Sequence, residues 1–301
     1  MPLFYKKGKK YMLRIFTDSD TDITPREAKE YGYTMISMPY IINGETFYPY
    51  KDGTEDFDFH AFYDMLRKGT LPTTAALSPM EYMEYFEPVF AAGDDILYVH
   101  FSAAMSGTFN AMNLALEELK EKYPERKFYT VDTKGITICA YYTVRRIGKL
   151  YKEGKTAEEI LKWAETEVDK AGTYFYASDL KFFAKSGRVS GFKAFMGGII
   201  GVKPIIYMSS EGKMGSIDKA RGTKNTIAKI IDYMKKLQDN IKDHEIVIGN
   251  ADAPHMVEEL RAAIEAEFGK DLKILVVSVN PTAGSHCGPD TVGVVFHAIH
   301  R

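Results

Sequence analysis

Hydroxyl-bearing residues and a glycine lie at the start of a predicted helix, in the segment SAAMSGTFNAMNLALEEL at 102–119. An apolar run just before it predicts a strand, and the apolar spacing from Phe109 to Leu119 predicts the helix. Because a helix begins with free backbone N–H groups and the positive end of its dipole, this position suits an anion. Ser102 or Ser106 can also cap the helix, and one serine can cap while the other binds a ligand.

Two further segments carry side chains suited to bind an anion. In LPTTAALSP (71–79), a threonine hydroxyl such as that of Thr74 either satisfies the local backbone or donates to a ligand oxygen. In 280–296, predicted as a loop between two strands, His286 is flanked by small residues, so we expect its ring to face a cavity. Histidine can act there as a base, an acid or a donor to a carboxylate.

A basic turn, KSGR at 185–188, lies in a segment at 180–205 that combines five glycines with apolar residues. Glycine weakens a helix by about 1 kcal/mol relative to alanine, so this density favours close backbone approach or a cavity over plain core packing. The other histidines have no metal-ligand spacing, and we expect no metal site.

Length and composition limit the classes of protein. The 301 residues are enough for two domains, and the net charge of −2 does not favour a nucleic-acid partner. Two cysteines cannot form a disulfide framework and are expected to be reduced thiols in a cytoplasmic protein. No apolar run reaches the roughly 20 residues that span a bilayer, so we expect a soluble protein.

Alternation of short apolar runs with amphipathic segments predicts an α/β fold of two domains. After an N-terminal extension at 1–12, an open parallel α/β sheet domain is expected at 13–172. An α+β domain with a mixed or antiparallel sheet is expected at 173–301. Helices are predicted at 107–122, 135–150, 156–171, 223–238 and 254–268. Ser78 and Pro79 predict the start of another helix, and Asn43-Gly44 predicts a hairpin turn. Ligands bind at the carboxyl ends of strands in open α/β sheets, where the chain has polar clusters at 17–19, 102–108 and 132–133.

Seven motifs, in this order, together resemble the DegV family of fatty-acid-binding proteins along nearly the whole chain. They are TDSDTDIT, LPTTAALSP, SAAMSGTFNA, VDTKGIT, LKFFAKSGRVSG, GVKPII with KARGTKNT, and AGSHCGPDTVG. The resemblance implies a long apolar tunnel between two domains that holds one fatty acid. It also implies a subunit without turnover of its own, which presents the fatty acid to a separate ATP-dependent fatty acid kinase subunit for phospholipid synthesis.

Transferred to this sequence, the resemblance makes Thr74, Ser106 and His286 the carboxylate-binding residues. It places a second group near the ligand or the tunnel: Ser102, Gly107, Gly187, Arg188 and Ser285. It places a third group on the surface that meets the kinase subunit: Lys219, Arg221 and Lys224. No cofactor is implied beyond a bound fatty acid of about C14–C18, the length that fits the burial of roughly 15 methylenes at ~0.8 kcal/mol each.

The sequence departs from the family pattern at three places and leaves two other functions open. Residues 75–78 are Ala-Ala-Leu-Ser where the family usually has Ser-Gln-Pro-Ser, Ser186 replaces a glycine, and Asp290 replaces another. One alternative is an acyl hydrolase with Ser106 as nucleophile and His286 as base, although the chain has no Gly-x-Ser-x-Gly elbow. The other is a fatty-acid sensing or trafficking protein without a kinase partner.

Overall fold

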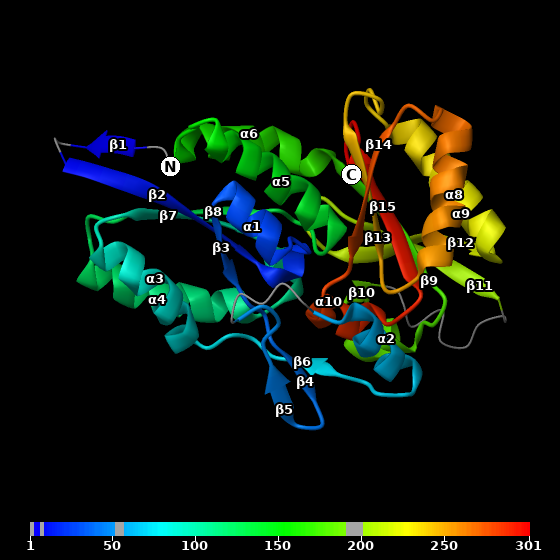
Figure 1. Ribbon diagram of the computed structural model, residues 1–301, viewed down its shortest axis with the longest axis horizontal. Coiled ribbons are helices and arrows are strands. Elements are labelled where there is room, and N and C mark those ends of the chain that lie inside the picture. Colours follow the sequence, from blue (N-terminus) through cyan, green and yellow to red (C-terminus); the bar gives the residue numbers. More distant parts are fainter. Residues whose placement is uncertain (1–2, 7–8, 52–56, 191–200) are drawn as a thin grey trace.

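The computed structural model describes residues 3–6, 9–51, 57–190 and 201–301, which form two sheet-containing domains (Figure 1). The first half has an open sheet with helices on both faces, and the second half has a mixed sheet. The predicted two-domain α/β architecture is therefore confirmed. The division at 172/173 stays a prediction; the first strand of the second sheet, β9, begins at Ala171.

The first sheet has parallel strands in the order β3-β2-β7-β8, and β1 pairs antiparallel with the start of β2. Helices α3 and α4 pack on one face, and α1, α5 and α6 lie on the other. Strand β7 is buried along its whole length because both faces are covered. The strands are β1 (Leu3–Lys6), β2 (Lys9–Asp18), β3 (Tyr33–Ile36), β7 (Asp95–His100) and β8 (Phe128–Asp132). The helices are α1 (Pro25–Tyr31), α3 (Pro79–Ala91), α4 (Thr108–Lys122), α5 (Ile138–Lys152) and α6 (Ala157–Glu167).

A small antiparallel sheet, β5-β4-β6, lies beside the first domain, and helix α2 lies between β5 and β6 along the chain. Asn43 and Gly44, both with positive φ, make the two-residue turn between β4 and β5, as the Asn-Gly pair predicts. Strand β6 pairs with β4 so that Thr74 lies opposite Tyr40. The elements are β4 (Tyr40–Ile42), β5 (Glu45–Phe47), α2 (Phe59–Arg67) and β6 (Thr73–Thr74).

The second sheet is mixed, in the order β10-β12-β11-β9-β15-β13-β14. Helices α8 and α9 cover one face, and α5 of the first domain packs on the other, so α5 lies between the two sheets (Figure 1). The strands are β9 (Ala171–Ala177), β10 (Val189–Ser190), β11 (Val202–Met208), β12 (Met214–Arg221), β13 (Glu245–Asn250), β14 (Lys273–Ser278) and β15 (Thr291–His297). The helices are α8 (Thr223–Leu237) and α9 (Pro254–Phe268).

The structure differs from the sequence-based prediction at residues 280–296, because helix α10 (Pro281–Cys287) occupies part of the expected loop. The N–H of Ala283 donates to the Asn280 side chain at 3.0 Å, and Pro281 fills the first helical position. A seven-residue helix of small residues has no apolar periodicity to reveal it. Helix α7 (Lys181–Ser186) and the 3₁₀ turns η1 (Ser19–Thr21), η2 (Ala103–Met105) and η3 (Val168–Lys170) complete the helical elements described.

Two predicted helices begin or end elsewhere. Helix α5 begins at Ile138, after the predicted start at 135, because Lys134 and Thr137 both have positive φ. Helix α6 ends at Glu167, before the predicted end at 171, and a 3₁₀ turn leads into β9. The predicted glycine-rich apolar stretch lies largely outside the described residues, at 191–200. Among the described helices, none has both the length and the apolar character needed to cross a bilayer.

Candidate functional site

A cavity lies between the two domains and contains about 980 Å³ of empty space, including the part open to solvent. Its wall comes from η1, η2, the start of α5, strands β9, β11 and β12, and helix α10. Most of the side chains are apolar, as a ligand with a long alkyl chain requires. The large apolar residues of the wall are Met38, Phe101, Met105, Ile136, Ile138, Phe175, Phe183, Met208, Met214 and Val279.

Thr74 and His286 meet at the cavity wall, although they are far apart in the sequence. The Thr74 hydroxyl and His286 Nε2 are 2.9 Å apart and share a hydrogen bond. Pairing of β6 with β4 fixes Thr74, and the Asn280 cap and Pro281 fix the start of the helix that carries His286. The structure therefore brings together two of the three side chains that the sequence indicates for an anion.

The His286 ring is uncharged at neutral pH. Burial, together with the positive charges of Arg188 and Lys185, lowers the pKa of His286 to about 4. A neutral imidazole has one N–H donor and one acceptor nitrogen, so His286 can give one hydrogen bond to a ligand oxygen while Thr74 uses the other nitrogen.

Ser106, the third expected residue, also lines the cavity and lies just before α4. Its hydroxyl accepts the N–H of Thr108, the first helical residue, at 3.2 Å, whereas the N-cap position that the sequence suggested for a serine is Gly107. Its O–H hydrogen is still available to a ligand. The Thr108 hydroxyl, in contrast, is used inside the protein, by the N–H of Leu77 at 3.2 Å and the Tyr82 hydroxyl at 2.9 Å.

Four of the residues expected near the ligand are not among those that line the cavity: Ser102, Gly107, Gly187 and Ser285. The Ser102 hydroxyl donates to the carbonyl of Gly212 at 2.7 Å, and the Ser285 hydroxyl donates to the carbonyl of Pro281 at 2.8 Å. Gly187, with φ of 65°, ends α7.

Arg188 lines the cavity and is the positively charged member of its described wall. Its guanidinium donates to the carbonyl of Ser186 at 2.6 Å, and the residue is exposed, so it lies at the open side. Lys219, Arg221 and Lys224 are exposed around the end of β12 and the start of α8. They form a basic patch outside the cavity.

Three buried carboxyl groups, those of Asp18, Asp20 and Asp22, lie where β2 ends in η1. Burial raises the pKa of Asp18 and of Asp22 to about 7, despite hydrogen bonds that favour their charged forms. Burial, reinforced by its two acidic neighbours, raises the pKa of Asp20 well above its ordinary value. Asp20 lines the cavity and was not expected from the sequence, where only three aspartates at alternate positions after a buried strand mark it.

The N–H and the side-chain amide of Asn280 both donate to Asp22, at 2.8 and 2.7 Å. The contact joins η1 of the first domain to the cap of α10 in the second. The same helix therefore carries a contact to the acidic cluster at its start and His286 in its last turn.

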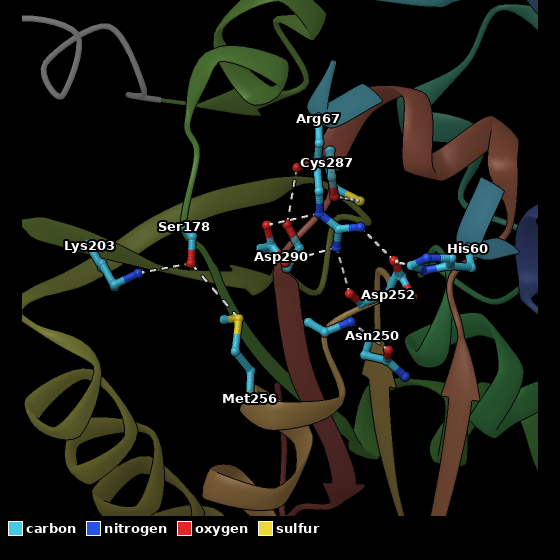
Figure 2. Close-up of polar contacts among 12 residues, drawn as sticks. His60, Arg67, Ser178, Lys203, Asn250, Asp252, Met256, Cys287 and Asp290 are labelled. Carbon is cyan, nitrogen blue, oxygen red and sulfur yellow. Dashed lines mark hydrogen bonds and ion pairs between the residues drawn. The ribbon is translucent and has the colours of Figure 1, made fainter. Parts of the chain in front are cut away.

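Arg67 of α2 ties the first domain to the second from outside (Figure 2). Its guanidinium lies 2.6 Å from a carboxylate oxygen of Asp252 and 3.0 Å from one of Asp290. The Tyr63 hydroxyl, on the same helix, donates to the carbonyl of Val279 at 2.8 Å. These contacts hold α2 over α10, so Asp290, a departure from the family pattern, has a structural role here.

The two cysteines, Cys139 and Cys287, are free and buried, as predicted. Cys287 lines the cavity, where burial raises the pKa of its thiol to about 12. No group of three or more metal-ligating side chains is found in the described part of the chain.

Comparison with known proteins gives matches along most of the chain. Residues 12–298 match the model of the DegV family, COG1307. The DegV domain-containing protein CPE0026 of Clostridium perfringens is 30% identical over 283 residues, which cover 94% of this chain and 96% of that protein.

Two solved structures share the fold. The fatty-acid-binding DegV family protein of Thermus thermophilus has a TM-score of 0.83 at 23% identity, covering 95% of this chain and 99% of that one. The stearic-acid-binding protein of Eubacterium ventriosum has a TM-score of 0.81 at 19% identity, covering 95% and 98%. The extent of the family match and the curated relative lead to one conclusion: the chain belongs to the DegV family.

Proposed function

We propose that the protein binds one long-chain fatty acid in the interdomain cavity, with the carboxylate held by Thr74, Ser106 and His286. The observation that carries the proposal is the hydrogen-bonded pair of Thr74 and His286 on the wall of a mostly apolar cavity. An alkyl chain gains about 0.8 kcal/mol for each methylene removed from water. A buried carboxylate loses that gain unless donors surround it.

The three side chains supply those donors without a buried positive charge. Ser106 can give an O–H, and the hydrogen-bonded pair of Thr74 and neutral His286 can give one further donor. That donor is the Thr74 O–H when Nε2 carries the ring proton, and the Nδ1–H when Nε2 accepts from Thr74. The start of α4 adds the positive end of a helix dipole beside Ser106. A chain of about C14–C18 fits this proposal, and the stearic-acid-binding relative supports that range.

We extend the proposal to a partner. The bound carboxylate is presented to a separate ATP-dependent fatty acid kinase subunit in the cytoplasm, which would supply acyl phosphate for phospholipid synthesis. The exposed basic patch of Lys219, Arg221 and Lys224 supports a surface that meets a partner. Capture of an ATP-binding protein that is lost with Arg221→Glu would separate this function from sensing or trafficking without a kinase.

The contacts of Ser106 favour a carrier over an acyl hydrolase. A serine nucleophile needs a base within hydrogen-bond reach. His286 Nε2 bonds to Thr74, and the Ser106 hydroxyl bonds to the N–H of Thr108. A fluorophosphonate probe should therefore leave Ser106 unlabelled.

Native mass spectrometry of the purified protein tests lipid binding directly. We expect the mass of one C14–C18 fatty acid on the wild-type protein, and loss of most of it in the double variant Thr74→Ala, Ser106→Ala. Ser285→Ala is the matched control, because its hydroxyl is used within α10. Equal lipid occupancy in the double variant and the wild type would refute the site.

A further inference from the structure

Asp20 has a buried carboxyl group that the protein itself does not satisfy. The residue is 6% exposed, lines the cavity, and has one carboxyl oxygen, Oδ1, with no hydrogen-bond partner among the described residues. Asp18 bonds to Tyr98, and Asp22 bonds to Asn280 through Oδ1, while its Oδ2 also has no partner among the described residues. Asp20 is the one of the three that lines the cavity. Buried polar groups nearly always have partners, so a bound molecule is a reasonable source of the missing one.

Asp20 does not belong to the carboxylate-binding end of the cavity. Its neighbour Asp22 bonds to Asn280 at the start of α10, whereas His286 lies in the last turn. With a rise of 1.5 Å per residue, the two ends of this helix are roughly 9 Å apart. The charges that act on His286 are those of Arg188 and Lys185, and those that act on Asp20 are its two acidic neighbours.

Thr137 adds a second polar group beside Asp20 on the cavity wall. Its N–H donates to the Asp20 carbonyl at 2.8 Å, and its hydroxyl makes no cap hydrogen bond to α5, the helix that follows. The backbone has φ of 52° and ψ of −132°, a strained conformation for a β-branched residue. Three other threonine hydroxyls of the wall donate to backbone carbonyls: Thr173 to Ala171, Thr282 to Met38 and Thr291 to Cys287.

We infer that Asp20 and Thr137 form a second polar contact in the cavity, which binds a hydroxyl group partway along the acyl chain. The ligand class would then be long-chain hydroxy fatty acids in preference to unsubstituted ones. The inference rests on the proposed function and names its substrate more closely. Burial and the two acidic neighbours raise the pKa of Asp20, which favours its acid form, and a carboxylic acid can both donate to and accept from a hydroxyl. An unsubstituted chain would leave these groups unpaired, which a binding site penalises strongly.

Binding of octadecanoic acid and of a series of hydroxyoctadecanoic acids, with the hydroxyl at successive mid-chain carbons, tests the inference on delipidated protein. We expect at least one hydroxy acid to bind the wild type tenfold or more tightly than octadecanoic acid. Asp20→Val should bring that ratio to about one, whereas Asp20→Asn, which can still donate and accept, should keep a clear preference. Thr173→Val is the matched control and should leave the ratio unchanged, since its hydroxyl already bonds to Ala171.

The outcomes separate the two proposals. If octadecanoic acid binds and the ratio is the same in the wild type and in Asp20→Val, the second polar contact is refuted while fatty acid binding stands. If no acid of this length binds the wild type, the proposed function is refuted and the inference falls with it. Melting temperatures of the variants show whether each one is folded under the assay conditions.

Discussion

The cavity has two sets of polar residues that differ in chemistry, although burial shifts pKa values in both sets. Thr74, Ser106 and His286 are hydroxyls and an imidazole, whereas the cluster in η1 consists of aspartates. Burial lowers the pKa of His286 to about 4 and raises the pKa of Asp22 to about 7. Loss of solvation disfavours the charged form of each group, so it moves bases and acids in opposite directions.

This difference shows how the cavity can receive an anion. The donor end carries neutral hydrogen-bond donors, and the raised pKa values of the aspartates partly neutralise the acidic end. Arg188 is the positively charged group of the described wall and is exposed. A carboxylate is therefore attracted to the donor end by oriented N–H and O–H groups, and the acidic end repels it less than three ionised aspartates would.

The largest expected effect comes from removing the donor end. Thr74→Ala with Ser106→Ala should weaken fatty acid binding by about 2–6 kcal/mol, at roughly 1–3 kcal/mol for each donor lost from a charged group. Isothermal titration calorimetry on delipidated protein measures the change. Ser285→Ala should bind the fatty acid as the wild type does. Equal affinity in all three proteins would contradict the assignment of the carboxylate to the donor end of the cavity.

Neutralising the acidic end should change how stability depends on pH. The pKa of Asp22 is about 7 in the folded protein against 3.8 ordinarily, so the folded state binds more protons between these values. The stabilisation that Asp22 contributes is present below pH 3.8 and is lost as pH rises through 7. The free energy of unfolding of Asp22→Asn, measured in urea, should therefore rise by roughly 3–4 kcal/mol relative to that of the wild type between pH 4 and pH 8. A constant difference across that range would be inconsistent with a buried acid.

His286 should show the opposite slope. Its pKa of about 4 lies below the ordinary 6.5, so the unfolded chain binds the extra proton between these values. The stabilisation that neutral His286 contributes is present above pH 6.5 and is lost as pH falls to 4. Between these pH values, the free energy of unfolding of the ligand-free wild type in urea should fall by on the order of 3 kcal/mol, and that of His286→Gln should lack this fall. Parallel profiles of the two proteins would mean that the ring is not desolvated.

The smallest effect is expected from the ion pairs outside the cavity. Arg67→Ala should lower the free energy of unfolding by about 1–2 kcal/mol, because Asp252 and Asp290 are partly exposed. Both pH slopes should persist, since α2 packs over α10 without supplying a group to either end. A change in the slope at one end alone would show that α2 controls that end.

Local sequence signals predicted much of the fold. Ser78 with Pro79 marks the start of α3, Asn43 with Gly44 marks a hairpin, and the apolar spacing marks α9 over its full length. Helix α10 was missed because its seven residues acquire their helical role from contacts with distant parts of the chain, such as Thr282 with Met38.

The candidate site was predictable where hydroxyls or a histidine stand among small residues. Thr74, Ser106 and His286 all line the cavity, and their role in binding stays a prediction. The sequence alone does not single out Asp20, because Asp18 and Asp22 are also aspartates and the three alternate along the chain. Only the packing of η1 against α10 distinguishes it, because Asp22 bonds to Asn280 while Asp20 lines the cavity.

The most direct test is the ¹³C NMR signal of octadecanoic acid labelled at its carboxyl carbon and bound to the protein. We expect one bound resonance in the wild type, displaced from that of the free acid, which shifts again with His286→Gln and stays in place with Ser285→Ala. The same bound resonance in all three proteins would place the carboxylate away from His286 and contradict the site.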